Sequence, residues 1–439
     1  MLPRMSAPNP AALGEPIGAT LPLWSVAPFV ALILGIALLP LFAHHWWERS
    51  RNQFLIAVGL AAPVGVAFWF LDRHALEHAL VEYLAFIALL GSLFTVSGGI
   101  ALSGKLRATP LSNTLLLLVG AVVANVIGTT GASMLLIRPF LEMNAERERR
   151  THLPIFFIFL VSNIGGCLTP IGDPPLFLGY LRGVPFTWTL SLFPEWLFCL
   201  AFVLVVFYAL DVRAFRLDGG IPLAAKGQPT ERIRLLGRHN LVFLALLVGA
   251  VFLPEFLRIA AMGAIALASL SLTNRAIRER NMFSFGPIRE VAILFFGIFV
   301  TLVPALLILE ARGDQMGLTR PWQFFWLTGV LSSFLDNAPT YVAFTSIALS
   351  TVGVAGTADA LRPLAALVDH DTGVRLLQAI SLGAVFMGAN TYIGNGPNFM
   401  VRAITESRGT RMPSFFGYMA WSGAILIPCF VLVTLLFFR

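Results

Sequence analysis

The chain has 439 residues, of which 57% are hydrophobic and only 12% are charged, and its mean hydropathy is +0.81. A soluble domain carries about twice that charged fraction. The composition therefore argues against a soluble protein and predicts a polytopic protein embedded in a lipid bilayer. The net charge of +7 does not indicate a nucleic-acid partner, because the basic residues lie in short loops between apolar runs, as is typical of cytoplasmic loops in membrane proteins.

Apolar segments recur along the whole chain after a Pro- and Ala-rich tail over residues 1–21, which we do not interpret as a cleaved signal. Each is near the length needed to cross about 30 Å of hydrocarbon. They are predicted at 23–44, 53–71, 80–103, 112–141, 152–183, 190–212, 240–254, 256–273, 290–310, 323–350, 376–401 and 414–438. The expected fold class is an all-α polytopic membrane protein.

Four segments are longer than one straight span needs and are interrupted near the middle by small or polar residues: 112–141, 152–183, 323–350 and 376–401. Basic clusters flank 112–141 on both sides, so both flanking loops are expected in the cytoplasm and the segment must enter and return. Both loops around 323–350 are poor in basic residues, which predicts a return on the opposite side. The sequence thus predicts two re-entrant hairpins.

The order of spans repeats with inverted orientation. Residues 22–212 are predicted to form a first transmembrane repeat with an extra leading span, and residues 240–439 a second, inverted repeat, also with an extra leading span. A basic cytoplasmic linker, 213–239, joins them. Each repeat would hold one re-entrant hairpin and one broken transmembrane helix. Inverted repeats with helices broken at matching places are the signature of alternating-access transporters.

Polar interruptions inside a bilayer need a protein or water environment that satisfies their backbone groups. The four interruptions therefore predict a central cavity, where helix N-termini suit an anion and helix C-termini a cation. Asp173 and Asp336 are the acids that we place deep in the membrane, and we take Asp336 as the second-half counterpart of Asp173. An intramembrane carboxylate is functional by default, and these two are predicted ligands of a transported Na⁺ that also exchange protons. The alternative is a structural helix cap.

Neutral side chains at the interruptions could complete the site with hydroxyl and amide groups, although such residues also serve as contacts between membrane helices. They are Asn125, Thr129, Thr130, Ser162, Asn163, Thr169, Asn337, Thr340, Asn390, Thr391, Asn395 and Asn398. Arg138 and Arg402 are the cations nearest the interruptions. Either could hold a carboxylate by two parallel hydrogen bonds, although snorkelling to the cytoplasmic face is the commoner role. No catalytic triad, nucleotide loop or zinc motif is found, so an enzyme is not expected.

The run S-N-I-G-G-C-L-T-P-I-G-D (Ser162 to Asp173) and the run L-D-N-A-P (Leu335 to Pro339) resemble the signatures of NhaD-type sodium/proton antiporters of the ion transporter superfamily. The run G-A-N-T-Y-I-G-N-G-P-N (Gly388 to Asn398) is more similar to citrate transporters of the same superfamily. The antiporter resemblance implies ion binding by Ser162, Asn163, Thr169, Asp173, Asp336 and Asn337. This chain departs from those antiporters at Pro174-Pro175, and Ala389 stands where a Ser-Asn-Thr triplet would begin.

The leading functional prediction is a sodium (or lithium)/proton antiporter in the inner (plasma) membrane, working by alternating access. The observation behind it is two buried acids with no deeply buried cation. The alternative is a cation-coupled citrate or dicarboxylate transporter, in which helix N-termini and Asn side chains hold the anion. No resident cofactor is expected beyond transported or coupling Na⁺ and H⁺. A homodimer is what the family resemblance implies.

Overall fold

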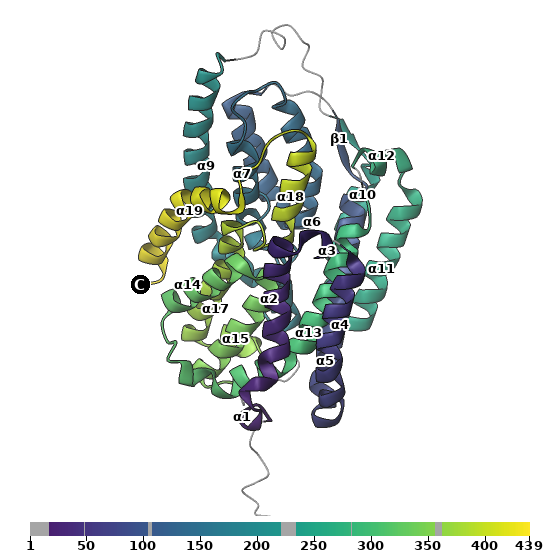
Figure 1. The fold of residues 1–439 in the computed structure, drawn as a ribbon, viewed down its shortest axis with the longest axis vertical. Helices are drawn as coiled ribbons and strands as arrows, with labels where there is room; N and C mark the ends of the chain where they lie inside the picture. Colours follow the sequence, from purple (N-terminus) through teal and green to yellow (C-terminus); the bar gives the residue numbers. More distant parts are fainter. Residues whose placement is uncertain (1–16, 48, 104–107, 221–233, 282, 356–361) are drawn as a thin grey trace, which may run out of the picture.

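The computed structural model describes residues 17–47, 49–103, 108–220, 234–281, 283–355 and 362–439. Most of the predicted tail, part of the predicted linker and part of the loop at 351–375 therefore lie outside the described residues. The fold is helical (Figure 1), apart from a two-stranded antiparallel ribbon in which β1 (Ala101–Ser103) pairs with β2 (Arg234–Leu236).

The predicted apolar segments are all helical. In the first half the helices are α1 (Ile17–Thr20), η2 (Leu23–Val26), α2 (Ala27–Phe42), α3 (His44–Trp47), α4 (Ser50–Leu71), α5 (Arg73–Ser97), α6 (Pro110–Met143), α7 (His152–Leu160), η3 (Ile164–Leu168), α8 (Pro174–Leu181), η4 (Phe186–Leu192) and α9 (Phe193–Leu217). In the second half they are α10 (His239–Ala250), α11 (Glu255–Leu272), α12 (Arg275–Arg280), α13 (Gly286–Arg312), η6 (Gly313–Met316), α14 (Pro321–Phe334), α15 (Asn337–Val352), α16 (Ala365–Val368), α17 (Asp371–Met387), η7 (Gly388–Asn390), α18 (Gly396–Ser407) and α19 (Phe415–Phe437).

Within the described ranges, eight helical segments are long and apolar enough to cross a membrane. The remaining predicted segments are shorter helices or are divided into two pieces by an interruption. Large apolar side chains such as Phe70, Phe256 and Phe416 are exposed on the outer surface, as lipid-facing residues are. The protein is therefore a multi-pass membrane protein.

Helix α6 reverses direction within its length. Asn113 near its start and Asn144 just beyond its end exchange two hydrogen bonds, of 3.0 and 2.8 Å, although they are 31 residues apart. A straight helix would separate them by about 46 Å. The reversal falls at Gly128, whose φ of 77° and ψ of 153° are not helical. A side chain at this backbone conformation would be strained, and a Cβ there would lie 3.3 Å from the Ile171 carbonyl oxygen.

The chain also reverses between α14 and α15. Leu335 and Asp336 are extended between the two helices. The rings of Phe324 and Phe344, one from each helix, lie 6.4 Å apart in an edge-to-face arrangement. At the far ends, Asp314 N, which precedes α14, donates to Ser350 Oγ at the end of α15 over 3.0 Å. The two helices are therefore antiparallel neighbours.

The two remaining interrupted segments share one local structure. Each runs from a helix through a 3₁₀ turn into an extended threonine, Thr169 or Thr391, and then through a glycine to the first residue of a new helix. Gly172 packs so tightly that a Cβ would fall 2.2 Å from the Gly166 carbonyl oxygen, and Gly394 approaches Gly388 in the same way at 2.6 Å.

This likeness corrects two expectations. Asp173 precedes α8 with φ and ψ of −144° and 143°, and Asn395 precedes α18 with −156° and 142°. The local counterpart of Asp173 is therefore Asn395 and not Asp336. When the two segments are matched on their extended threonines, Ala389 corresponds to Cys167 and not to Ser162. The sequence match relied on Asn163 and Asn390, which lie at different distances from the threonines: six residues before Thr169 and one residue before Thr391.

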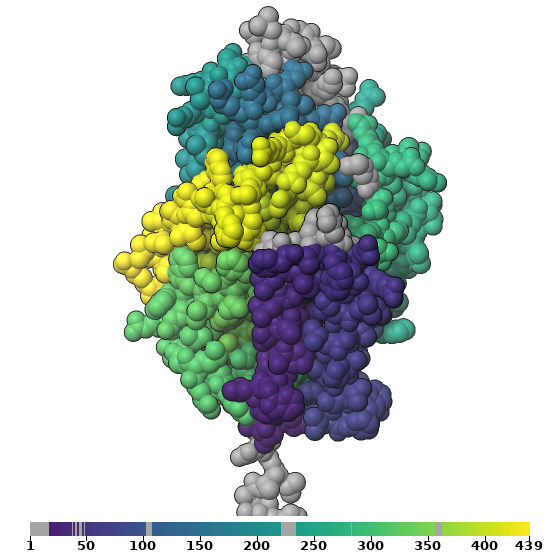
Figure 2. Space-filling model, viewed as in Figure 1, coloured from purple at the N-terminus to yellow at the C-terminus, as the bar shows by residue number. Residues whose placement is uncertain are grey.

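Helices from the two halves of the chain interleave. Helix α18 of the second half packs against α6 and α7 of the first, whereas α8 of the first half packs against α15 and α17 of the second. In Figure 1 the yellow α18 lies beside the blue α6 and α7. Figure 2 shows the yellow C-terminal segment crossing the surface between the blue and green regions. The two halves meet at the interrupted segments.

A second group of helices flanks this assembly. Helix α13 packs against α4 and α5, and α11 packs against α5 and α10, on the lower and right-hand sides of Figure 1. Loops that the charge pattern places on one membrane side do lie together. Arg149 pairs with Asp218 at 2.9 Å, and β1 pairs with β2. We call this end of the molecule, with residues 98–103, 108–109, 144–151, 218–220 and 234–238, the basic end.

Candidate functional site

Asp173 lies where the two halves meet, and its side chain is 1% exposed. Its Oδ1 accepts hydrogen bonds from Thr129 Oγ1 at 2.9 Å and Asn395 Nδ2 at 3.3 Å, and its Oδ2 accepts one from Asn337 Nδ2 at 2.5 Å. The three donors come from the α6 reversal, the α18 N-terminus and the α15 N-terminus. Three of the four interruptions thus each contribute one hydrogen-bond donor to Asp173, which lies in the fourth. Asp173 and its three donors were all predicted as site residues.

Asn395 extends the junction toward the first broken segment. Its Nδ2 also lies 3.3 Å from the Ser162 carbonyl oxygen and 3.2 Å from Asn163 Oδ1. Asn163 Nδ2 in turn donates to Asn398 Oδ1 at 2.7 Å, so the broken segments are joined by side-chain amides. Ser162 Oγ lies 2.7 Å from Ser133 Oγ. Ser133 was not predicted, because a lone serine within an apolar helix gives no sequence signal.

Asp336 plays a different part from Asp173. It precedes α15, and its Oδ1 accepts a hydrogen bond from Ala338 N at 3.1 Å, which is the capping role raised as the alternative. Its neighbour Asn337 supplies the bond to Asp173. Asn337 is fully buried, and its Oδ1 has no hydrogen-bond partner among the described residues. Thr340 donates to the Asp336 carbonyl oxygen at 3.1 Å within the same helix.

Four predicted site residues hold the interruptions in shape. Asn125 Oδ1 accepts from Leu168 N at 2.7 Å, and Thr169 Oγ1 donates to the Asn125 carbonyl oxygen at 2.5 Å. In the second half, Thr391 Oγ1 donates to the Ser333 carbonyl oxygen, and Asn390 Nδ2 donates to Ser333 Oγ at 2.9 Å. Each extended threonine therefore ties its broken segment to a reversing one.

Two helices begin at this junction without a side-chain cap within the described structure. Neither Asp173 nor Asn395 uses its side chain to cap the helix that it precedes, α8 or α18. Both helices have proline in the first turn, where a missing N–H costs no helical hydrogen bond. Helix N-termini carry partial positive charge and favour anions. The junction thus combines two positive helix ends, several amide donors and one buried carboxylate.

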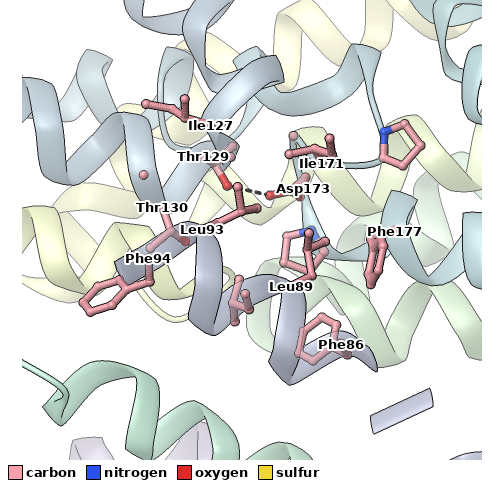
Figure 3. A pocket seen from close by; sticks show the side chains of 16 residues that line it. Phe86, Leu89, Leu93, Phe94, Ile127, Thr129, Thr130, Ile171, Asp173 and Phe177 are labelled. Carbon is pink, nitrogen blue, oxygen red and sulfur yellow. Dashed lines mark hydrogen bonds between the residues drawn. The ribbon is translucent and has the colours of Figure 1, made fainter. Parts of the chain in front are cut away.

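A small cavity of about 20 Å³ lies beside Asp173, room for about one water molecule. Figure 3 shows Asp173 and Thr129 directed toward one another, with Phe86, Leu89 and Leu93 of α5 along the wall. The remaining wall comes from the α6 reversal, from residues 170–174 and from Phe177 of α8. The apolar face of α5 therefore separates the polar junction from the flanking helices.

The structure also buries charges that sequence analysis placed at span ends or overlooked. Arg182 makes a bidentate pair with Glu82, at 2.9 and 3.0 Å. Asp211 is fully buried and pairs with Arg147 at 2.6 Å. The expectation that no cation is deeply buried is therefore wrong, and the described residues include buried acids besides Asp173, namely Glu82 and Asp211. Charges near the end of a span fold inward when a partner from another helix meets them, and hydropathy does not reveal that partner.

The chemistry of this junction is that of binding. No group of three or more His, Cys, Asp or Glu side chains in the described residues is arranged to hold a metal ion. Cys167, Cys199 and Cys429 are buried free thiols. A helical multi-pass protein with a polar junction at helix interruptions has the architecture that is typical of membrane transporters.

Residues 18–438 match the family model described as putative citrate transport. The chain belongs to that family, which is part of the ion transporter superfamily. No curated protein matches the chain.

Proposed function

We propose that the protein is a secondary active transporter for citrate or a related di- or tricarboxylate, coupled to a cation. The observation that carries the proposal is the convergence of Thr129, Asn337 and Asn395 on one carboxylate, Asp173, at two uncapped helix N-termini. A site that holds the carboxylate of Asp173 with neutral donors has the chemistry to hold the carboxylate of a substrate. Membership of the citrate transport family favours this reading over antiport.

Competition for the same amide donors would couple the cation to the anion. When Asp173 is ionised and free of cations, it occupies Asn337 Nδ2 and Asn395 Nδ2 itself. A proton or Na⁺ on Asp173 would weaken those bonds and release the amides to a substrate carboxylate. Asn337 Oδ1 supports a Na⁺ ligand role, because this buried acceptor has no partner in the described structure and its amide touches Asp173.

Alternating access would come from two inverted repeats, each with a re-entrant hairpin and a broken helix. The reversal of α6 at Gly128 and the antiparallel pair α14–α15 support the hairpins. The shared local structure around Thr169 and Thr391 supports the repeat. The cavity of about 20 Å³ is too small for citrate, so the junction must open to admit it. The protein would lie in the inner (plasma) membrane with its basic end facing the cytoplasm. It would form a homodimer, as the family resemblance implies.

Sodium/proton antiport is the second candidate, and one observation favours it. The carboxylate of Asp173 and the carbonyl oxygen of the Asn337 amide could form a small-cation site without any anion. In that case the cargo would be Na⁺ or Li⁺, exchanged for a proton on Asp173. The small cavity beside Asp173 is of the size that such an ion needs.

Purified protein in proteoliposomes distinguishes the two. Labelled citrate, succinate and malate are offered under an imposed Na⁺ gradient and, separately, under a proton gradient. Citrate accumulation that requires either gradient supports the proposal. Collapse of an acid-inside pH gradient on addition of Na⁺ or Li⁺, without carboxylate uptake, would instead establish antiport.

A further inference from the structure

Arg138 is a buried cation for which the described part of the chain shows no ion pair. It lies in the second arm of α6 and is 6% exposed, and within the described residues neither Nε nor Nη1 has a hydrogen-bond partner. Four other arginines are buried in the described part of the chain, and each has a partner. Arg147 pairs with Asp211, Arg182 with Glu82, Arg258 faces Glu255 at 4.0 Å, and Arg278 donates to the Thr95 carbonyl oxygen.

An unpaired buried guanidinium is costly, because a charge removed from water needs an opposite charge or several hydrogen bonds in exchange. Charged residues inside membrane bundles almost always pair, and those that face the bundle interior mark ion or substrate pathways. An anion bound from outside the protein would stabilise the Arg138 guanidinium, because the described residues provide no anionic partner for it.

The position of Arg138 indicates which anion. Along the second arm of α6 it lies nine residues beyond Thr129, a donor to Asp173, which corresponds to about 14 Å of helix. The direction is toward Asn144 and the basic end. Arg138 thus lies between the central junction and the end of the molecule that carries the basic loops.

Helix α18 packs against α6 and carries polar side chains of its own. Arg408 is exposed and follows the last residue of this helix, Ser407. One turn before Arg408, Thr405 is fully buried, and in the described structure its Oγ1 lacks a hydrogen-bond partner. Arg402 on the same helix already pairs with Glu406 at 3.1 Å and stacks over Tyr392.

We propose that Arg138 binds a carboxylate group of the transported anion between the central junction and the basic end. This inference rests on the proposed function. The planar guanidinium suits a carboxylate, because its parallel N–H groups can engage both oxygens. A lipid phosphate offers the same chemistry, but Arg138 is buried within the protein rather than on its lipid-facing surface. The cation would thereby give the substrate a second binding position on its route to Asp173.

The test is the concentration dependence of citrate transport from the basic end, in oriented membrane vesicles and in proteoliposomes. Arg138→Gln removes the charge, and Arg138→Lys keeps the charge but loses the planar fork. We expect the KM for citrate to rise at least tenfold in Arg138→Gln and about threefold in Arg138→Lys. Arg275→Gln is the matched control, since Arg275 already pairs with Glu279 on the surface at 2.8 Å, and the KM of this variant should stay within twofold of the wild type.

Several results would overturn the proposal. If Arg138→Gln is monodisperse in detergent and its citrate KM is unchanged, Arg138 does not bind substrate. If Arg138→Gln does not fold, an unchanged KM in Arg138→Lys leads to the same conclusion. If the effect appears only in vesicles that contain phosphatidylglycerol and vanishes in pure phosphatidylcholine, the ligand is a lipid headgroup. Wild-type protein that transports no carboxylate removes the proposed function as well, whereas normal wild-type transport with unaffected variants removes this inference alone.

Discussion

Asn395 Nδ2 lies 3.3 Å from Asp173 Oδ1, and the two residues occupy the same position in their respective broken segments. Each precedes a helix that starts with proline in its first turn, and neither caps that helix with its side chain. One position is an acid and the other an amide. The paired helix ends therefore meet with a single carboxyl group between them, and in the proposed transporter cation coupling would be concentrated on Asp173.

Replacement of Asp173 by Asn should abolish gradient-driven citrate accumulation, by about 100-fold or more. The substitution neutralises the group that is proposed to bind the coupling cation, so the cation gradient can no longer drive uptake. The neutral donors Thr129, Asn337 and Asn395 remain in place. The amide can still form hydrogen bonds, so the protein should fold and melt near the wild-type temperature. Labelled citrate uptake into proteoliposomes under Na⁺ and proton gradients measures the effect.

Asp336→Asn is the matched control. Asp336 Oδ1 caps α15 through Ala338 N, and Asn is as good a cap as Asp. We expect uptake within about threefold of the wild type, since capping costs of this kind are about 1 kcal/mol or less. Equal loss in both variants would show that the two acids act as one site, contrary to the geometry.

Much of the fold could be predicted from the sequence, because the bilayer forces apolar residues into long runs and polar interruptions stand out against them. All predicted segments are helical, and the interruption at Asn125 to Thr129 contains the reversal at Gly128. The basic residues on both flanks of segment 112–141 also predicted that this segment enters and returns. These signals are strong because the lengths of apolar runs, their polar interruptions and the charges of their flanks can all be read from the local sequence.

The partners of polar groups could not be predicted in this way. Nothing near Glu82 in the sequence indicates Arg182, one hundred residues away. Nor could the sequence distinguish Asp173, which collects donors from three segments, from Asp336, which caps its own helix. Both are acids with a proline within the next three residues, and only the packing of α15 and α18 against the first half separates their roles.

Gly172→Ala should disrupt the first broken segment. A Cβ at this position would fall 2.2 Å from the Gly166 carbonyl oxygen, and backbone cannot yield as a flexible side chain does. Overpacking of this kind costs about 1–3 kcal/mol, and the displaced Asp173 should lower citrate uptake at least tenfold. Gly59→Ala in α4 is the control, because its Cβ meets no atom within 4 Å. The measurements are thermal unfolding in detergent and citrate uptake. Equal stability and equal uptake in the Gly172→Ala and Gly59→Ala variants would contradict the prediction.

Glu82→Gln should be strongly destabilising. The pair with Arg182 is bidentate, and both side chains are less than 10% exposed. Removing one partner of a buried pair leaves an uncompensated charge and costs about 3–5 kcal/mol. Glu77→Gln is the control, since Glu77 pairs with Arg73 on the surface, where side-chain exposures are 50% and 60%, and such pairs contribute about 1 kcal/mol or less. Denaturation midpoints in mixed micelles compare the two; a similar small loss in both would contradict the burial of the Glu82 pair.

The reversal of α6 can be tested by cross-linking. The side chains of Asn113 and Asn144 hydrogen-bond to one another, so the double variant Asn113→Cys/Asn144→Cys should join readily through a short thiol-specific reagent. The background would replace the three native cysteines, all of which are buried, with alanine. Mass spectrometry of the linked peptides reports the yield.

The pair Asn113→Cys/Thr129→Cys is the control for that experiment. One residue lies near the start of α6 and the other directly after the reversal at Gly128, so about 24 Å of the first arm separates them, and no link should form with the same reagent. A continuous α6 would reverse the expectation for the first pair, because about 46 Å would separate its thiols. Linking of 113 to 144 without linking of 113 to 129 requires that the two ends of α6 meet, and therefore that the segment enters and leaves from the same end of the molecule.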